Sequence, residues 1–597
     1  MRLHDVIQPR FRLGEHRFAA AQDWRTITTP RVKVRLDADQ AITLRDGTVL
    51  RADVYRPASG GPCPVLLSSA AYNKELHSSG LPTGTNEIGL PYYLASHGYV
   101  HVVVARRGTA PSGGEPDGWF APREHEDLDE TITWCGTQPW SNGHVGMIGA
   151  SYYGTIQLVA AALGNPYLKA VMPSDPDTDL YRHAFYHGGV ANSGFLALWA
   201  AFNFTTAARQ RRVKPWLRHI LSYVVTRRLF RAVMDRALTP ERIQRIVDRS
   251  AMDPAFLRHY VAGIFDHKHD GPVYRALSPA VEKIEIPMLL ASNWSFASIH
   301  GFGAMDAFYR APSRDKKIFI APAHDWIMGR PWNDYQDEAI GFFDFHLKGM
   351  NNGYDRLPAV RYWLQGAKQW QSATAWPPVE AEAWVLQLQG GGVDNCAEGS
   401  LVPHARAGER SWLCIPKGNP IPSHLERVGE TQNLRYALTF ERDTDVVGPV
   451  HVTLVLKSTV IDTYVVTRIL DVAPDGTAFP LSHGFLLAST RAVREEVCTA
   501  NEIAHDFTRQ VPLVPGEATT LRFTPTPIAN RFRKGHKLVL EIASRKDQQR
   551  SGAGFGGRPD FVYFDSEAPQ YSCRNTIVEG ATEASRVEIH VLPSPTP

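Results

Sequence analysis

The sequence predicts a doubly wound α/β domain with an inserted helical cap, followed by a C-terminal all-β domain. Short apolar runs alternate with helical segments in the first half, an Arg- and aromatic-rich stretch interrupts them, and alternating hydrophobicity fills the last third. The chain has 597 residues, which suffices for two to four domains at about 150 residues each. Its composition, 43% hydrophobic and 21% charged, is that of an ordinary globular protein.

Apolar runs in the first half predict the central strands of a parallel sheet. Each run is bounded by Gly, Pro or charged residues, as is typical of strands that are covered on both faces. Segments with helical periodicity separate the runs, and this alternation indicates a doubly wound sheet. The predicted strands are Pro64–Ala70, Tyr99–Ala105, His144–Ala150, Pro287–Asn293 and Lys317–Pro322.

The other two parts of the chain have different patterns. Residues 175–284 carry apolar residues every three or four positions, which predicts inserted helices that cap the carboxyl edge of the sheet. The α/β domain then comprises residues 1–174 and 285–370. Across residues 371–597, short segments of alternating hydrophobicity are punctuated by turns, and this pattern predicts a β-sandwich of jelly-roll type.

Charge and composition exclude several classes of function. The 64 Lys and Arg residues nearly balance the 61 Asp and Glu residues, so we expect neither nucleic acid nor a membrane as partner. No apolar run approaches the roughly 18 residues of a transmembrane helix, and the N-terminal segment lacks the apolar core of a secretory signal. The six scattered cysteines indicate reduced thiols, and we expect a cytoplasmic protein. No metal-ligand or phosphate-loop motif is present, so we expect no metal and no cofactor.

The strongest chemical signal is a serine between a predicted strand and a predicted helix. Ser151 follows an apolar strand and precedes the helical segment Thr155–Leu163. A serine in such a tight turn needs small neighbours, and Gly149, Ala150 and Gly154 supply them. The turn would expose the hydroxyl group, and the start of the helix would place backbone N–H groups where an oxyanion forms. The pattern predicts a nucleophile elbow.

The residues around this elbow resemble those of the CocE/NonD family of serine hydrolases. GASYYG at residues 149–154 is similar to the family's G-x-S-Y-x-G elbow, and residues 126–140 resemble its E-D-x-x-D-x-I-x-W segment. Residues 105–115 are similar to D-x-R-G-T-G-x-S-x-G, with Ala105 in place of the aspartate. The family includes cocaine esterase, α-amino-acid ester hydrolase and X-Pro dipeptidyl-peptidase relatives. The resemblance implies an α/β-hydrolase domain and a C-terminal jelly roll.

The sequence indicates a candidate for the catalytic base but does not identify the catalytic acid. In α/β-hydrolases the residues follow in the order Ser, acid, His, which makes His324, just after the last predicted strand, the expected base. His300 is the alternative base. The family resemblance places the acid where this chain has Phe296, and a phenyl ring cannot accept a hydrogen bond from an imidazole. Asp325 and Asp306 lie nearby in sequence and are the substitutes that we consider.

Further site residues follow from the family resemblance and from the elbow. Tyr72 occupies the position at which the family places an oxyanion-stabilising hydroxyl group, and the backbone N–H of Tyr152 is the expected second donor. We expect Trp294, Phe296 and Tyr153 to contact the substrate.

Two classes of function compete at this point. The first is a serine hydrolase or acyl transferase that acts on a small-molecule ester, amide or thioester through a Ser151 acyl-enzyme. The alternative is a hydrolase-fold protein that binds a small molecule or catalyses a non-hydrolytic biosynthetic step, which Phe296 in the acid position favours. X-Pro peptidase activity would need an amine-recognising acidic site, which the sequence does not locate. A homodimer is one candidate assembly.

Overall fold

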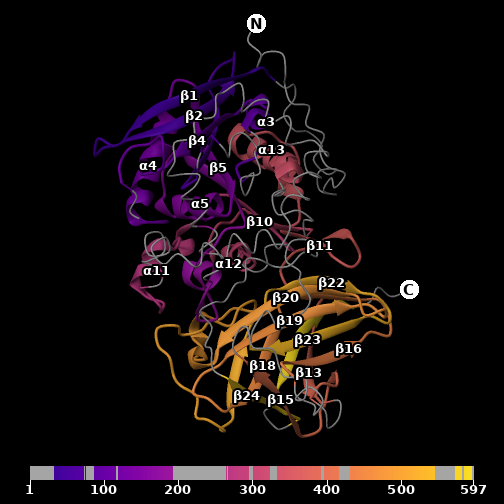
Figure 1. Ribbon diagram of the computed structural model, residues 1–597. Coiled ribbons are helices and arrows are strands. Elements are labelled where there is room, and N and C mark those ends of the chain that lie inside the picture. The colour runs from indigo at the N-terminus through magenta and orange to yellow at the C-terminus, as the bar shows by residue number, and fades with distance from the viewer. Residues whose placement is uncertain are drawn as a thin grey trace.

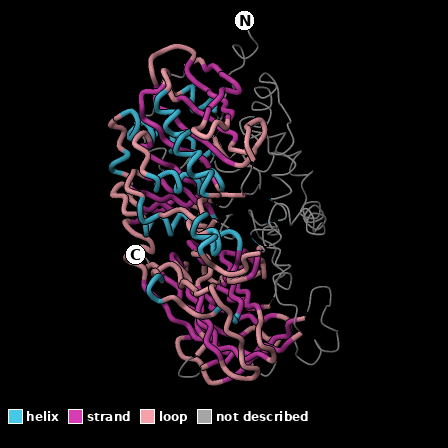
Figure 2. Tube along the Cα trace, turned by 90° about the vertical axis from the view of Figure 1, so that its left-hand side faces the viewer, coloured by secondary structure: helices cyan, strands magenta, loops and turns pink. Residues whose placement is uncertain are grey.

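The structure is a computed structural model with two regions of different architecture. The upper region in Figure 1 combines a sheet with helices, and the lower region consists mainly of strands. The view in Figure 2 shows most of the helices gathered in the first region. The described residues are 32–72, 74–75, 87–89, 91–115, 118–192, 196, 199, 264, 266–294, 300–322, 332–390, 395–415, 431–544, 572–580 and 584–593.

The first region is built on a ten-stranded, mostly parallel sheet. From β4 to β11 neighbouring strands run parallel, while β1, β2 and β12 pair antiparallel at the edges. The strands lie in the order β1 (Val34–Thr43), β2 (Val49–Pro57), β4 (Val100–Ala105), β3 (Cys63–Ala70), β5 (Ser141–Ala150), β6 (Leu168–Ser174), β9 (Met288–Asn293), β10 (Lys316–Ala321), β11 (Val360–Leu364) and β12 (Gln369–Ala373).

This sheet confirms the predicted fold class and the five predicted strands. The strand β6, which lies between β5 and β9, is not among the predicted strands. The sheet also extends to Ala373, so the predicted domain boundary at residue 370 falls inside β12.

Helices cover both faces of the sheet because successive strand residues point to opposite sides. Met147 of β5 packs in one apolar cluster with Ile156, whereas Ile148 packs in a second cluster with Phe343. Strands buried on both sides account for the continuous apolar runs of the sequence. The α-helices in the described part of the chain are α3 (Pro91–Ser96), α4 (Pro122–Thr137), α5 (Tyr152–Leu163), α11 (Pro272–Leu277), α12 (Gly303–Arg310) and α13 (Trp332–Lys348).

The second region is the predicted all-β domain. Several of its strands alternate buried and partly exposed residues, as β24 and β25 show most clearly. The strands are β13 (Glu382–Gln389), β14 (Gly399–Val402), β15 (Gly408–Cys414), β16 (Asn433–Thr439), β17 (Thr444–Gly448), β18 (His451–Ser458), β19 (Tyr464–Val472), β20 (Ala478–Leu487), β21 (Thr519–Phe523), β22 (Ile528–Phe532), β23 (Lys537–Ala543), β24 (Cys573–Glu579) and β25 (Arg586–Val591).

Part of the predicted cap connects the two regions. The described segment after β6 forms a π-helix and a two-stranded hairpin, while residues 200–263 of the predicted cap lie outside the described residues. The hairpin turn fits closely against β20, because a Cβ atom on Gly188 would lie 2.3 Å from the carbonyl oxygen of Phe485. The short elements are η2 (Leu180–Phe185), β7 (Tyr186–His187), β8 (Val190–Ala191), η3 (Val281–Lys283), η5 (Tyr354–Arg356), η6 (Ala488–Thr490) and η7 (Glu495–Val497).

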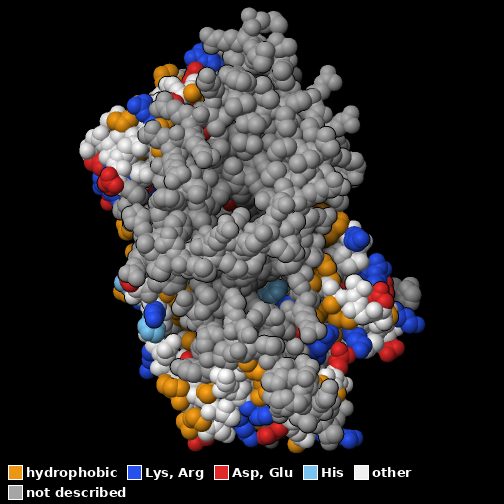
Figure 3. Space-filling view, in the orientation of Figure 1, with side chains coloured by type: hydrophobic (Ala, Val, Ile, Leu, Met, Phe, Trp, Pro, Cys, Tyr) orange, Lys and Arg blue, Asp and Glu red, His pale blue; other side chains and the backbone are white. Residues whose placement is uncertain are grey.

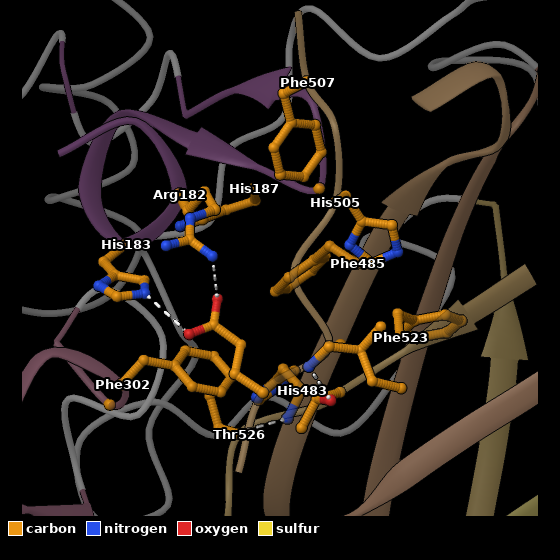
Figure 4. A pocket seen from close by; sticks show the side chains of 16 residues that line it. Arg182, His183, His187, Phe302, His483, Phe485, His505, Phe507, Phe523 and Thr526 are labelled. Carbon is orange, nitrogen blue, oxygen red and sulfur yellow. Dashed lines mark hydrogen bonds and ion pairs between the residues drawn. The ribbon is translucent and has the colours of Figure 1, made fainter. Parts of the chain in front are cut away.

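A partly buried ion network joins the two regions beside this hairpin. Glu502 of the all-β domain accepts from Arg182 at 3.2 Å and lies 3.3 Å from His183 Nε2, as the dashed lines in Figure 4 show. Burial alone would raise the pKa of Glu502, but Arg182 and His183 outweigh burial and lower it to about 2. Burial alone would lower the pKa of His183, but the Glu502 carboxylate raises it above the ordinary 6.5.

These opposite shifts predict a pH window for the stability of the domain interface. Because the pKa of Glu502 is lowered, this residue stabilises the fold at pH values above 4.5, the ordinary pKa of glutamate. This contribution is lost as the pH falls toward about 2. Because the pKa of His183 is raised, this residue stabilises the fold at pH values below 6.5, the ordinary pKa of histidine. This contribution is lost as the pH rises through the raised pKa. We expect the network to contribute most between pH 4.5 and 6.5.

The measurement is the melting temperature of the wild type and of Glu502→Gln across this pH range. The difference between the two proteins should be largest inside the window and should shrink on both sides. A difference that does not depend on pH would contradict the prediction.

Two surface properties bear on possible partners. On the face shown in Figure 3, basic and acidic side chains lie interspersed over the described surface. None of the described helices combines the length and the apolar character that crossing a bilayer requires.

Candidate active site

Ser151 lies at the sharp turn between β5 and α5. Its backbone has φ of 60° and ψ of −116°, a conformation that a residue with a Cβ atom rarely adopts. The residue is 9% exposed. Strain of this kind concentrates at functional sites, where the surrounding structure holds it in place. The backbone geometry is therefore that of a nucleophile elbow.

Two glycines make this turn possible, as the sequence predicts. A Cβ atom on Gly149 would lie 2.3 Å from Cβ of Tyr153, and one on Gly154 would lie 2.4 Å from the carbonyl oxygen of Ser174. Gly149 also has φ of 149°, which favours glycine. Neither position has room for a larger side chain, so the glycines let α5 approach both β5 and β6.

The helix start is anchored through the side chain of Tyr152. Its hydroxyl group donates to Glu124 at 2.6 Å and accepts from the backbone N–H of Phe120 at 3.2 Å, while its ring stacks on the Phe120 ring. Burial raises the pKa of Tyr152 well above its ordinary value, so the phenol stays protonated. Tyr152 is the first residue of α5, where backbone N–H groups have no acceptor within the helix.

Tyr72 lies beside the elbow, two residues beyond the end of β3. Its ring centroid is 5.7 Å from that of Tyr152 and 5.8 Å from that of Tyr153. The hydroxyl oxygen of Tyr72 accepts a hydrogen bond of 2.8 Å from the indole N–H of Trp199. Tyr153, which we expected to contact the substrate, is 1% exposed and packs between this ring and Gly149.

A buried lysine lies two residues beyond Tyr72. The Lys74 ammonium group has no exposed surface and lies 2.8 Å from Asp53 and 2.9 Å from Asp39. Because breaking a buried ion pair costs about 3 to 5 kcal/mol, these contacts hold the Lys74 side chain in place.

Three aspartates that the sequence analysis did not single out follow β6. Asp175 is fully buried, and its two oxygens accept from Asn293 Nδ2 at 3.2 Å each. The carboxylate of Asp177 lies 3.2 Å from Nδ1 of His300, and Asp179 binds Arg182 at 2.8 Å. The signal in the sequence was the run SDPDTD directly after an apolar segment, at the carboxyl end of a strand.

Asp306, one of the two substitutes for the missing acid, lies in a different environment. It is on α12, where it accepts from Thr178 Oγ1 and from Arg310, both at 2.5 Å. It lines a cavity of about 400 Å³ at the domain interface together with Arg182. A second cavity, of about 70 Å³, lies beside the ion network (Figure 4). Ser151 is not among the described residues that line either cavity.

The remaining predicted residues fall into two groups. Trp294 is 9% exposed, and its indole N–H donates to the carbonyl oxygen of Trp363 at 2.8 Å, so its polar edge points to β11. His324, Asp325 and Phe296 lie outside the described residues. Among the residues that are described, no group of three or more His, Cys, Asp or Glu side chains could hold a metal ion.

The strand order, the crossovers and the strained serine turn together define an α/β-hydrolase fold with a serine elbow. The same architecture is found in a CocE/NonD family hydrolase from Staphylococcus aureus, with a TM-score of 0.72 and 22% identity over 95% of this chain and 99% of that chain. A structure of α-amino acid ester hydrolase aligns with a TM-score of 0.64 and 16% identity over 94% of this chain and 96% of its own.

Sequence comparison gives the family. Residues 46–327 match the family model described as X-Pro dipeptidyl-peptidase (S15 family), and residues 352–588 match that of the X-Pro dipeptidyl-peptidase C-terminal non-catalytic domain. Cocaine esterase from Rhodococcus sp. (strain MB1 Bresler) is 25% identical over 544 residues, which cover 84% of this chain and 89% of the esterase. The chain belongs to the CocE/NonD-like X-Pro dipeptidyl-peptidase family, whose members are serine-type esterases and peptidases.

Proposed function

We propose that this protein is a serine hydrolase or acyl transferase that forms a Ser151 acyl-enzyme from an ester or amide. The observation that carries the proposal is the strained backbone of Ser151 at the start of α5, with Tyr72 beside it. An elbow of this kind presents a hydroxyl group at the carboxyl edge of the sheet, where a carbonyl carbon can approach it.

The chemistry requires a base, and His324 takes that role in the proposal. Its imidazole removes the proton from the Ser151 hydroxyl group as the oxygen bonds to the acyl carbon. The imidazolium then protonates the leaving alcohol or amine when the bond to the acyl carbon breaks. Water, or an acceptor nucleophile, gives a proton to the same imidazole and attacks the acyl carbon; the imidazolium then returns that proton to the Ser151 oxygen as its bond to the acyl carbon breaks.

Tyr72 and the Tyr152 amide stabilise the oxyanion in this mechanism. The Tyr72 hydroxyl oxygen accepts from Trp199, and in this mechanism the hydroxyl group donates its own proton to the developing negative charge. Hydrogen bonds in a chain polarise one another, and the Trp199 contact therefore strengthens Tyr72 as a donor. Removal of one such donor typically costs about 100- to 1000-fold in kcat.

We therefore expect Tyr72→Phe to lower kcat for p-nitrophenyl butyrate by about 100- to 1000-fold, with little change in KM. The phenyl ring keeps the contacts with Tyr152 and Tyr153 and loses only the hydroxyl group. Steady-state kinetics of the purified variant measure both constants.

Trp199→Phe is the companion variant, because it keeps an aromatic ring and removes the indole N–H that donates to Tyr72. Its effect should be smaller than that of Tyr72→Phe and in the same direction. Unchanged kcat in Tyr72→Phe would exclude its hydroxyl group from the oxyanion site.

Covalent labelling tests the proposal as a whole. A fluorophosphonate probe should label the native protein, and peptide mass spectrometry should locate the adduct on Ser151. The heat-denatured protein serves as the control and should remain unlabelled. An unlabelled native protein that also fails to hydrolyse p-nitrophenyl acetate and butyrate would favour the non-hydrolytic alternative, a role in small-molecule binding or a biosynthetic step.

A further inference from the structure

Two cysteines that are far apart in the sequence face each other in the all-β domain. Cys414 is the last residue of β15, and Cys573 is the first residue of β24. The two strands are antiparallel, and their register pairs Cys414 directly with Cys573. β15 is the end strand of the large sheet and lies next to β24 (Figure 1). The cysteine pair therefore lies at one end of the ladder that attaches β15 to the sheet.

The register places the two sulfur atoms on the same side of the sheet. Directly opposed residues of antiparallel strands point to the same side, and their Cα atoms lie about 4.5 to 5.5 Å apart. A disulfide bond requires Cα atoms that are about 4.4 to 6.8 Å apart, so this separation suits one. Both residues belong to the buried face of their strands, Cys414 with 4% and Cys573 with 7% of its surface exposed.

The two thiols are in contact with each other. The side chain of Cys414 forms a hydrogen bond with the sulfur atom of Cys573. The two atoms that a disulfide bond would join are thus neighbours, and neither strand has to leave its place in the ladder for the bond to form.

Polar side chains surround the sulfur atom of Cys573. Thr463 Oγ1 and Asn575 Oδ1 each lie 3.8 Å from it. Asn575 also donates to Thr463 at 3.0 Å and to Ser544 at 2.9 Å, which holds both groups in position. The site around this thiol is therefore polar, although it lies on the buried face of the sheet.

These contacts make Cys573 the more reactive thiol of the two. The hydrogen bond with Cys414 outweighs burial and, together with those of Thr463 and Ser458, lowers the pKa of Cys573 from 9.0 to about 7. A substantial fraction of this thiol is thiolate at neutral pH, and the thiolate is the form that attacks an oxidant.

We propose that Cys414 and Cys573 form a reversible disulfide bond when the protein meets hydrogen peroxide, and that this bond fastens β15 to β24. The Cys573 thiolate attacks one oxygen atom of the peroxide, the O–O bond breaks, and hydroxide leaves as Cys573 becomes a sulfenic acid. The Cys414 sulfur then attacks the Cys573 sulfur, and the S–O bond breaks with loss of a second hydroxide. The two thiol protons convert both hydroxides to water. Two thiols and one peroxide thus give one disulfide and two water molecules.

The other cysteines supply an internal control and a background to remove. Cys135 is fully buried in α4, and burial raises its pKa, so its thiol stays protonated. Cys63 and Cys498 are half-buried and Cys396 is exposed, so peroxide can reach them. Their replacement by serine leaves Cys135 and the pair as the cysteines of the full-length protein.

The test is peroxide treatment of this native triple-serine protein. We expect its intact mass to fall by about 2 Da, because a disulfide has two hydrogen atoms fewer than the two thiols. Peptide mapping without reduction should find Cys414 linked to Cys573, with Cys135 still a thiol. Dithiothreitol should restore the mass and both thiols by exchange. The protein unfolded in urea is the control, and it should give mixed products that include Cys135, because unfolding removes the strand register.

Cys414→Ser in the same background separates the two chemical steps. It removes the sulfur that attacks second and keeps the one that attacks the peroxide. The expected product is a sulfenic acid on Cys573, which dimedone traps as a stable adduct. Cys573→Ser should give neither the adduct nor the disulfide. If these variants do not fold, peptide mapping of the triple-serine protein decides the question without them.

The bond should also raise the melting temperature of the all-β domain. It closes a long loop that contains β16 to β23, and such a link reduces the conformational freedom of the unfolded chain. We expect the oxidised protein to melt about 4 to 10 °C above the reduced protein, with no such rise in peroxide-treated Cys414→Ser. Differential scanning calorimetry with and without dithiothreitol measures the shift.

Two results would overturn the proposal. In the first, both thiols of the native protein still react with an alkylating reagent after peroxide treatment. In the second, Cys573 is oxidised to a sulfinic acid without a link to Cys414. Neither result bears on the proposed acyl-enzyme chemistry of Ser151, which involves none of these cysteines.

Discussion

Ser151→Ala is expected to lower kcat for p-nitrophenyl butyrate by about a million-fold, to the residual rate that substrate binding and oxyanion stabilisation supply. The effect is so large because the variant removes the atom to which the acyl group becomes bonded, and no described neighbour on the turn can replace it. Stopped assays at high enzyme concentration measure the residual rate, and fluorophosphonate labelling should disappear in parallel.

Ser174→Ala is the control for this variant. Ser174 is a fully buried serine at the end of the adjacent strand, and its backbone carbonyl oxygen, which the substitution retains, is the group that accepts from Ser151. We expect its kcat to stay within a few-fold of wild type. A Ser151→Ala protein that keeps more than a few per cent of wild-type activity would show that another group carries the reaction.

His324→Gln is expected to produce a loss of similar size, about a million-fold in kcat, because the serine hydroxyl group is a weak nucleophile without a base. Glutamine can keep a hydrogen bond to a neighbour but cannot take up a proton at neutral pH. The pH profile of kcat/KM gives a second readout. In His324→Gln the inflection that the base produces in the wild type should vanish, and any residual rate should rise with hydroxide concentration.

His300→Gln separates the two candidate bases. The His300 imidazole is 3% exposed, and its Nδ1 faces Asp177 at 3.2 Å; a glutamine amide can donate to the same carboxylate. We expect kcat within about tenfold of wild type for this variant. A collapse of activity in His300→Gln with full activity in His324→Gln would transfer the role of the base to the loop after β9, with Asp177 as its acid.

The fold was predictable wherever the hydrophobic periodicity of a segment indicated a helix or a strand. The helix after Ser151 is confirmed to its last residue and ends at Gly164, whose φ of 73° is the left-handed conformation expected there. The strand β6 was not identified because its segment LKAVMPS carries an exposed lysine and a proline at residue 173. Both interrupt the apolar run by which a buried strand is recognised.

The candidate site was predictable where its residues lie close together in sequence. The elbow needs Ser151, its glycines and the helix start within a few residues, so the pattern of small residues and the helical period revealed it. The position of Asp175 near the elbow depends on the order of β5, β6 and β9 across the sheet, which no local sequence pattern predicts. Proximity in sequence pointed instead to Asp306, which the structure places beside Arg310 and Thr178.

The contact between Trp199 and Tyr72 would link selectivity for the acyl group to stabilisation of the oxyanion. Trp199 belongs to the segment predicted to cover the carboxyl edge, where the choice of acyl group would be made, yet its N–H reaches the phenol that is proposed to stabilise the oxyanion. Under the proposed mechanism, a change in this segment that displaces the indole, in natural divergence or in a mutant library, would therefore also change kcat. Under this proposal, libraries that hold residue 199 constant retain the indole N–H that Tyr72 accepts while they vary the rest of the segment.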